Sequence, residues 1–189
     1  MEAGELQDIV VSVLAVAVAF SIGAGMVFFP IILLTVGVGF VAHELAHRFV
    51  ANHYGARAFY RAWPEGLFFM LALALISGGR FLFAAPGAVY IYSYYLSRRE
   101  NGIISLAGPL TNLAIALIFL FLSVAVGLRG TPRAEILAAS LLYFGTYVNA
   151  YLAFFNLLPI PPLDGSKVIA WNFPLWAFLM VILVVVLFL

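Results

Sequence analysis

Long apolar stretches dominate this chain of 189 residues and restrict how it can fold. Hydrophobic residues make up 66% of the sequence and charged residues 9%, which is typical of an integral membrane protein. Lipid offers no hydrogen-bond partners, so backbone inside a bilayer must form helices or a closed barrel. Apolar runs at about 9–28, 30–51, 103–128 and 134–158, with a shorter one at 175–189, favour helices. We predict an all-α polytopic membrane protein with about five to six membrane segments.

The stretch at 66–96 is apolar but is interrupted at Ser77-Gly78-Gly79-Arg80 and at Pro86-Gly87. Each half is too short to span in the usual way, so the stretch either crosses once as a broken element or enters the membrane and returns. A re-entrant path would keep the flanking arginines on one side, as the positive-inside rule favours. These arginines are Arg48, Arg57, Arg61, Arg80, Arg98 and Arg99. The sequence therefore favours the re-entrant path.

Two short segments beside this stretch, 58–63 and 88–92, have the aromatic and β-branched residues of strands. They predict a short re-entrant or interfacial β element, whose edge could hold an unwound substrate by backbone pairing. An aromatic belt at the membrane surface explains the same segments equally well. That belt would consist of Trp63, Tyr90, Tyr92, Tyr94 and Tyr95.

Two histidines and a glutamate interrupt the apolar run at 30–51, in the segment HELAH at 43–47. Positions four apart share one face of a helix, so His43 and His47 can bind one metal ion while Glu44 reaches a metal-bound water. Ionisable side chains at membrane depth are costly and persist mainly where they face a protein interior or a cavity. A chance match is the alternative, but two of the chain's three histidines lie in this motif. The motif predicts a hydrolytic zinc site.

Two histidines leave such a site incomplete, because catalytic zinc usually has three protein ligands and keeps one position for water. The chain has no cysteine, and after Glu100 its only acidic residues are Glu135 and Asp164. Glu135 follows a polar loop on the predicted opposite side, whereas Asp164 lies in a proline-rich loop that interrupts a helix. Asp164 is thus placed to complete the site. A simple turn aspartate before Gly165 is the other interpretation, and both stay open here.

The two motifs together resemble the site-2 protease family of intramembrane zinc metalloproteases. HELAH at 43–47 and NLLPIPPLDG at 156–165 occur in the family's order, each in or beside an apolar segment. SLAGPLTN at 105–112 is similar to the family's Gly-Pro-containing stretch on its central span. The resemblance covers about 30–165, which we interpret as the catalytic core of a single membrane-embedded domain at 1–189. The family's PDZ or CBS modules are not found in the chain.

The resemblance implies that His43, His47 and Asp164 bind one Zn²⁺ per chain. It also implies that Glu44 is the catalytic base toward zinc-activated water and that Asn156 stabilises the oxyanion. Hydrogen bonding between helices is the alternative role for Asn156. The expected reaction is hydrolysis of peptide bonds within or near transmembrane segments of membrane-protein substrates. Such a substrate and the lipid bilayer are the expected partners.

Other classes of function fit the sequence less well. A net charge of +1 gives no reason to expect nucleic acid. A metal transporter would be expected to need a second histidine-rich membrane helix, and an inactive scaffold would not require Glu44. We expect a multi-pass protein of the cell membrane. Its active site opens toward the cytosol, because the end of the second span and the proline-rich loop share that side.

Overall fold

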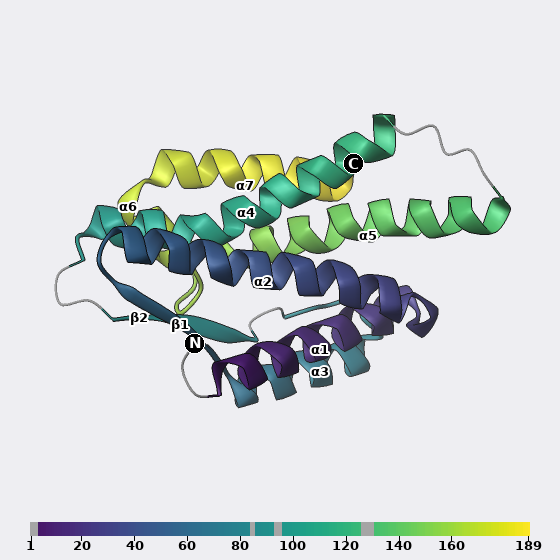
Figure 1. Ribbon diagram of the computed structural model, residues 1–189, viewed down its shortest axis with the longest axis horizontal. Helices are drawn as coiled ribbons and strands as arrows, with labels where there is room; N and C mark the ends of the chain where they lie inside the picture. The colour runs from purple at the N-terminus through teal and green to yellow at the C-terminus, as the bar shows by residue number, and fades with distance from the viewer. Residues whose placement is uncertain (1–3, 84–85, 93–95, 126–130) are drawn as a thin grey trace.

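Figure 1 shows the computed structural model of the protein, an elongated bundle of helices with a small sheet near one end. The structure describes residues 4–83, 86–92, 96–125 and 131–189. The long helices are α1 (Glu5–Ala24), α2 (Phe29–His53), α4 (Arg98–Ala125) and α5 (Pro132–Asn156). The shorter elements are a 3-10 turn (Met26–Phe28), α3 (Pro64–Ser77), α6 (Gly165–Trp171), α7 (Phe173–Phe188), β1 (Arg57–Ala62) and β2 (Gly87–Tyr92).

Four helices in the described residues are long and apolar enough to cross a membrane: α1, α2 with the turn before it, α4 and α5. The shorter apolar helices α3 and α7 supply the remaining predicted segments. Gly25, with a φ of 106°, and Pro30, in the first turn of α2, separate the first two spans. The prediction of an all-α polytopic membrane protein is confirmed.

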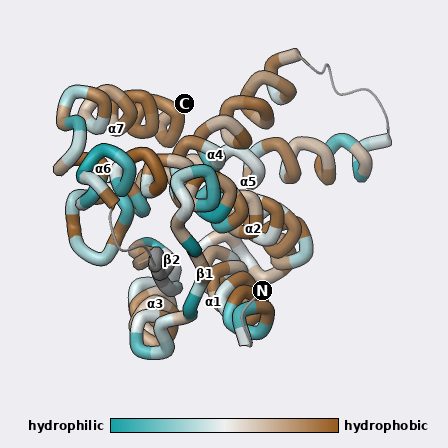
Figure 2. The backbone as a smooth tube through the Cα atoms, turned by 60° about the vertical axis from the view of Figure 1, so that its left-hand side comes forward, coloured by the Kyte–Doolittle hydropathy of each residue, from teal (hydrophilic) through white to brown (hydrophobic). Residues whose placement is uncertain are grey.

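Helices α2, α4 and α5 each contact the other two and form the centre of the bundle. Lipid tails are as apolar as the helix surfaces, so close van der Waals contact must hold membrane helices together, and small residues allow it. Ala116 on α4 and Ala150 and Ala153 on α5 are fully buried. Figure 2 shows the hydrophobic colour along most of these helices, with hydrophilic colour around α6 and also on α1, α3 and the outer end of α5.

The segment after β1 enters the bundle and returns. Helix α3 runs beside α1 until Gly79 meets Gly23, close to the end of α1. The chain then comes back to form β2, which pairs antiparallel with β1 and sets Tyr92 opposite Arg57. The segment thus leaves and returns at the same end of the bundle, and the re-entrant path stays a prediction. The expectation that Arg80 lies with the other five arginines is wrong, because the fourteen residues of α3 carry it about 20 Å toward the other end.

The two strands confirm the predicted β element. Its register runs from Arg57 opposite Tyr92 to Ala62 opposite Gly87. The alternative of an aromatic belt rests mostly on Tyr90, Tyr92, Tyr94 and Tyr95, whose side chains lie outside the described part of the chain. The evidence for the β element is therefore the pairing of the two backbones, and the aromatic side chains do not contribute to it.

Candidate metal centre

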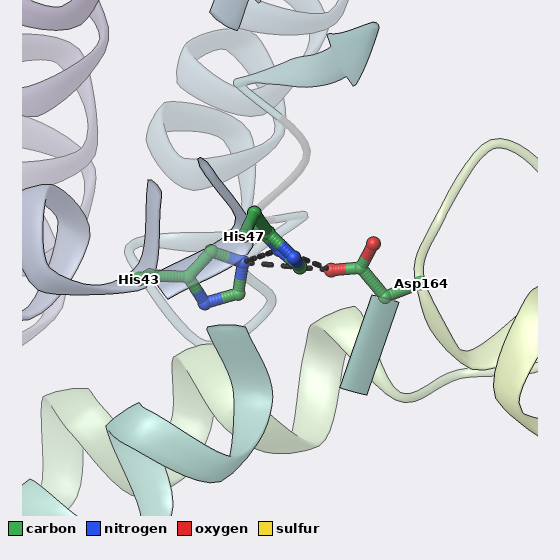
Figure 3. Close-up of side chains that lie close together, drawn as sticks. All are labelled: His43, His47 and Asp164. Carbon is green, nitrogen blue, oxygen red and sulfur yellow. Dashed lines mark hydrogen bonds and ion pairs between the residues drawn. The ribbon is translucent and has the colours of Figure 1, made fainter. Parts of the chain in front are cut away.

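His43 and His47 lie one turn apart on the buried face of α2, with 5% and 1% of their surface exposed. Figure 3 shows their rings converging on one point. The two Nε2 atoms are 2.9 Å apart. The shared face that the spacing of the motif predicted is therefore present in the folded chain.

Asp164 reaches the same point from the loop after α5. Prolines at 159, 161 and 162 prevent α5 from continuing, and α6 begins directly after Asp164. Its Oδ2 atom is 3.4 Å from Nε2 of His43 and 3.2 Å from Nε2 of His47 (Figure 3). The carboxylate oxygen therefore faces both imidazole nitrogens and is available as a ligand.

The proton positions of both imidazoles follow from their other contacts. Nδ1 of His43 is 2.6 Å from Oδ1 of Asn112, and Nδ1 of His47 is 2.7 Å from the carbonyl oxygen of Ile104. Both oxygens can only accept, so each Nδ1 carries a proton. In the neutral form of each ring, Nε2 presents a lone pair on the side of the carboxylate oxygen. A cation between them is the simplest way to stabilise this arrangement.

The spacing of the three donor atoms is close to that of zinc ligands. Ligand atoms about 2.0–2.2 Å from a tetrahedral metal ion lie about 3.3–3.6 Å from each other. The carboxylate oxygen lies 3.2 and 3.4 Å from the two Nε2 atoms, and the Nε2 atoms are closer to each other, at 2.9 Å. Among the residues that the structure describes, this is the one group of three His, Cys, Asp or Glu side chains within 4.8 Å. Two imidazoles and one carboxylate are a donor set that zinc accepts, with a fourth position left for water.

Glu44 and Asn156 border the same space. Two small cavities, of about 20 and 30 Å³, share four lining residues, namely His43, Glu44, Gly87 and Asn156. Each cavity is large enough for a water molecule. The amide of Asn156 donates to the carbonyl oxygen of Leu152 at 2.9 Å, so one N–H group of that amide is engaged within α5. The structure thus brings all five residues predicted for the site to one place.

Gly108 makes the close approach of α4 to the histidines possible. A Cβ atom at this position would lie 2.5 Å from Nε2 of His43 and would also clash with His47. Contacts this short do not occur for real side chains, so the position requires glycine. This gives the SLAGPLTN segment a physical role that the sequence alone did not reveal.

Sequence analysis also did not assign roles to Asn112 and Lys167. Asn112 was visible only as part of that motif, and its contact with His43 spans 69 residues. The ammonium of Lys167 donates to the carbonyl oxygen of Pro162 at 2.6 Å and lies 4.0 Å from Oδ1 of Asp164. Its position three residues after Asp164, one turn along α6, was the available signal.

Comparisons with known proteins agree with this site. The profile described as "Peptidase family M50" matches residues 124–175. The chain is 48% identical over 178 residues to "Putative zinc metalloprotease MJ0611" of Methanocaldococcus jannaschii, covering 92% of this chain and 87% of that protein. It is 33% identical over 153 residues to "Putative zinc metalloprotease YwhC" of Bacillus subtilis, covering 74% and 68%.

A more distant relative is "Zinc metalloprotease MJ0392" of M. jannaschii, 26% identical over 87% of this chain and 41% of that protein. No solved structure matches the chain significantly. The chain belongs to peptidase family M50, the family of the site-2 proteases. The sequence-based prediction of a membrane-bound zinc metalloprotease is thereby confirmed.

Proposed function

We propose that this protein hydrolyses peptide bonds within or near transmembrane segments of membrane-protein substrates, with one zinc ion held by His43, His47 and Asp164. The observation that carries the proposal is the convergence of three donor atoms beside Glu44, on a helix apolar enough to cross the membrane. In this proposal residues 1–189 form one membrane-embedded domain, whose catalytic core lies at about 30–165.

The residues divide the chemistry among themselves. When bound, the metal supplies Lewis acidity, which polarises the substrate carbonyl and makes water a usable nucleophile near neutral pH. Glu44 accepts the proton of the attacking water and later delivers it to the leaving amine. The N–H group of Asn156 that is not engaged with Leu152 donates to the oxyanion as it develops.

Substrate backbone must be unwound before attack, because a peptide bond in an intact helix is shielded by its own hydrogen bonds. The β1–β2 sheet lies where it can bind the unwound substrate segment, since Tyr60 of β1 and Gly87 of β2 line the cavity beside His43. An extended substrate segment could pair with a free edge of this sheet.

This step gives a prediction about substrates. Glycine or proline introduced near the scissile bond should raise the initial cleavage rate, because helix propensity falls by about 1 kcal/mol for Gly and about 3 kcal/mol for Pro relative to Ala. A peptide series with Ala, Gly and Pro at one position, compared at equal binding, measures the effect. Equal rates across the series would show that unwinding is not limiting.

The distribution of charge supports a site that opens toward the cytosol, in the cell membrane. Six of the cations belong to the end of α2, to β1, to the start of α4 or to α6, the elements that meet near the metal centre: Arg48, Arg57, Arg61, Arg98, Arg99 and Lys167. Of the described cations, Arg80 and Arg133 lie toward the other end. Cytoplasmic segments carry the excess of Lys and Arg in membrane proteins. Single cysteines at positions 57 and 98 should therefore both be labelled from the cytosolic side.

Glu44→Gln tests the proposed function. The variant should keep about one zinc per chain and cut membrane-spanning peptides about 10²–10⁴-fold more slowly than wild type, because it loses the base but no ligand. Metal analysis of purified protein and peptide cleavage are measured on the same samples. Retained cleavage would show that Glu44 is not the base. Zinc movement across vesicles without cleavage in wild type would support a transporter instead.

A further inference from the structure

Behind the metal centre, two buried asparagines form a continuous chain of hydrogen bonds across three helices. Oδ1 of Asn112 on α4 accepts from Nδ1 of His43 on α2 at 2.6 Å. Nδ2 of Asn112 donates to the carbonyl oxygen of Gly39 and to Oδ1 of Asn149, both at 3.0 Å. Nδ2 of Asn149 on α5 donates to the carbonyl oxygen of Gly145 at 2.9 Å. Both asparagines are fully buried.

Only one assignment of donors and acceptors is consistent along this chain of hydrogen bonds. A carbonyl oxygen only accepts, so the amide nitrogen of Asn149 must face Gly145, which leaves its oxygen to accept from Asn112. Both N–H groups of Asn112 are then donated, and its oxygen faces His43 and can only accept. Gly39 and Asn149, which both accept from Asn112, therefore determine together which way the Asn112 amide points. The amide of Asn112 in turn determines which nitrogen of His43 carries a proton.

The packing of α2 supports the same arrangement. A Cβ atom at position 39 would lie 3.2 Å from Nδ2 of Asn112 and 3.0 Å from Cγ of Asn149, so only glycine lets both amides reach this part of α2. Asn149 lies two turns before the end of α5, where the loop to Asp164 begins. The chain of hydrogen bonds thus joins α2, which carries two candidate ligands, to α5, which leads into the loop that carries the third.

We propose that Asn112 and Asn149 are positioning residues that hold His43 in the orientation and protonation that zinc requires. Asn149 does so without contacting any of the three candidate ligands. The inference rests on the proposed function in one respect, namely that His43 binds the metal. Partners behind a metal-binding histidine typically contribute about 10–100-fold to metal affinity or activity.

The test compares the retention of zinc in full-length protein with a chelator present. Asn112→Leu and Asn149→Leu should each release zinc about 10–100-fold faster than wild type. Thr111→Val and Thr146→Val are matched controls, since each removes a side-chain hydrogen bond within the same two helices but outside the chain. Both controls should release zinc at the wild-type rate. Cobalt-substituted protein should show an altered visible spectrum in the two leucine variants alone.

Two further variants separate positioning from a general loss of folding. Asn112→Asp keeps an acceptor for His43 and should retain zinc better than Asn112→Leu. The double variant Asn112→Leu with Asn149→Leu should be no worse than Asn112→Leu alone, because both changes break one chain. Additive losses, an Asp variant no better than Leu, or an Asn149→Leu protein that behaves like Thr146→Val would each overturn the inference.

His43→Ala separates this outcome from a failure of the proposed function. If wild type binds no zinc, or if His43→Ala retains it as well as wild type does, then His43 is not a ligand and the proposed function fails. If His43→Ala loses zinc while both asparagine variants keep it, the proposed function stands and the positioning inference alone is wrong.

Discussion

The three central helices and the segments that flank them use polar residues in opposite ways. In the core of α2, α4 and α5, the buried polar side chains contact one another across helices at the centre of the bundle. In the flank, which comprises α1, β1, α3 and β2, the charged contacts gather at the end where the chain begins. Glu5 pairs with Arg48, and Asp8 lies 3.5 Å from Arg61. Polar side chains in the core gather beside the candidate metal centre, whereas those in the flank form ion pairs that attach the flank to the core or stay within the flank.

The contact between flank and core changes along the bundle. At the end with the metal centre, Glu5 also accepts from the backbone N–H of Tyr60, and Ser12 is 2.8 Å from the Tyr60 hydroxyl. Burial raises the pKa of Tyr60 above its usual value, so this hydroxyl keeps its proton. Farther along, Phe20 packs edge-on against Tyr147 and Tyr151. Beyond these rings lies a cavity of about 620 Å³. The flank is thus fixed most tightly beside the site.

The largest expected effect is in the core, at Gly108. Gly108→Ala should reduce zinc from about one per chain to nearly none, because the added methyl group occupies the space where the two imidazoles meet the metal. Gly37→Ala on α2 is the control, since its Cβ atom would lie 3.7 Å from its nearest neighbour in Val13. Metal analysis of both proteins measures the zinc content per chain, which should fall in Gly108→Ala and stay near one in Gly37→Ala. Full zinc content in Gly108→Ala would mean that α4 can move away without loss.

A second prediction concerns the junction between flank and core. Glu5→Ala leaves the guanidinium of Arg48, whose side chain is 28% exposed, without its buried partner, and should destabilise the fold by about 1–3 kcal/mol. Zinc content should stay near one per chain in the folded fraction. The double variant with Arg48→Met should recover part of the loss. Unfolding in detergent measures the change in stability, and metal analysis measures the zinc content. If Glu5→Ala lost zinc as well as stability, the flank and the core would not be energetically separate.

The smallest effect is expected inside the flank. Asp8→Asn removes a partly exposed ion pair with Arg61, which should change stability by about 0–1 kcal/mol and leave zinc and cleavage unchanged. The same unfolding assay detects it. A loss as large as that of Glu5→Ala would show that the entire end of α1, and not one buried carboxylate, anchors the flank.

The sequence predicted what depends on local patterns. The length of the apolar runs gave the long helices, and the four-residue spacing of His43 and His47 gave their shared face. The proline-rich loop marked where α5 must end and left Asp164 as the available acid.

The features that the sequence did not predict depend on contacts between distant segments. Nothing local to Asn149 or Glu5 indicates a partner, since these residues meet Asn112 and Arg48 only after the helices assemble. The depth of α3 was missed because Gly78 and Gly79 resemble an early break, although they follow a complete helix. Composition can place a residue in a membrane segment but cannot select its neighbour across the bundle.

The separation of the proposed ligands along the chain has a consequence for biosynthesis. His43 and His47 belong to the second helix to be made, whereas Asp164 follows about 120 residues later. At about 5–20 residues per second, the ribosome needs roughly 6–24 seconds to cover that interval. During this time the nascent chain carries the proposed base and two of the proposed ligands without the third. A protease that must be inserted beside other unfolded membrane proteins would thus become active only once nearly all of its helices are in place.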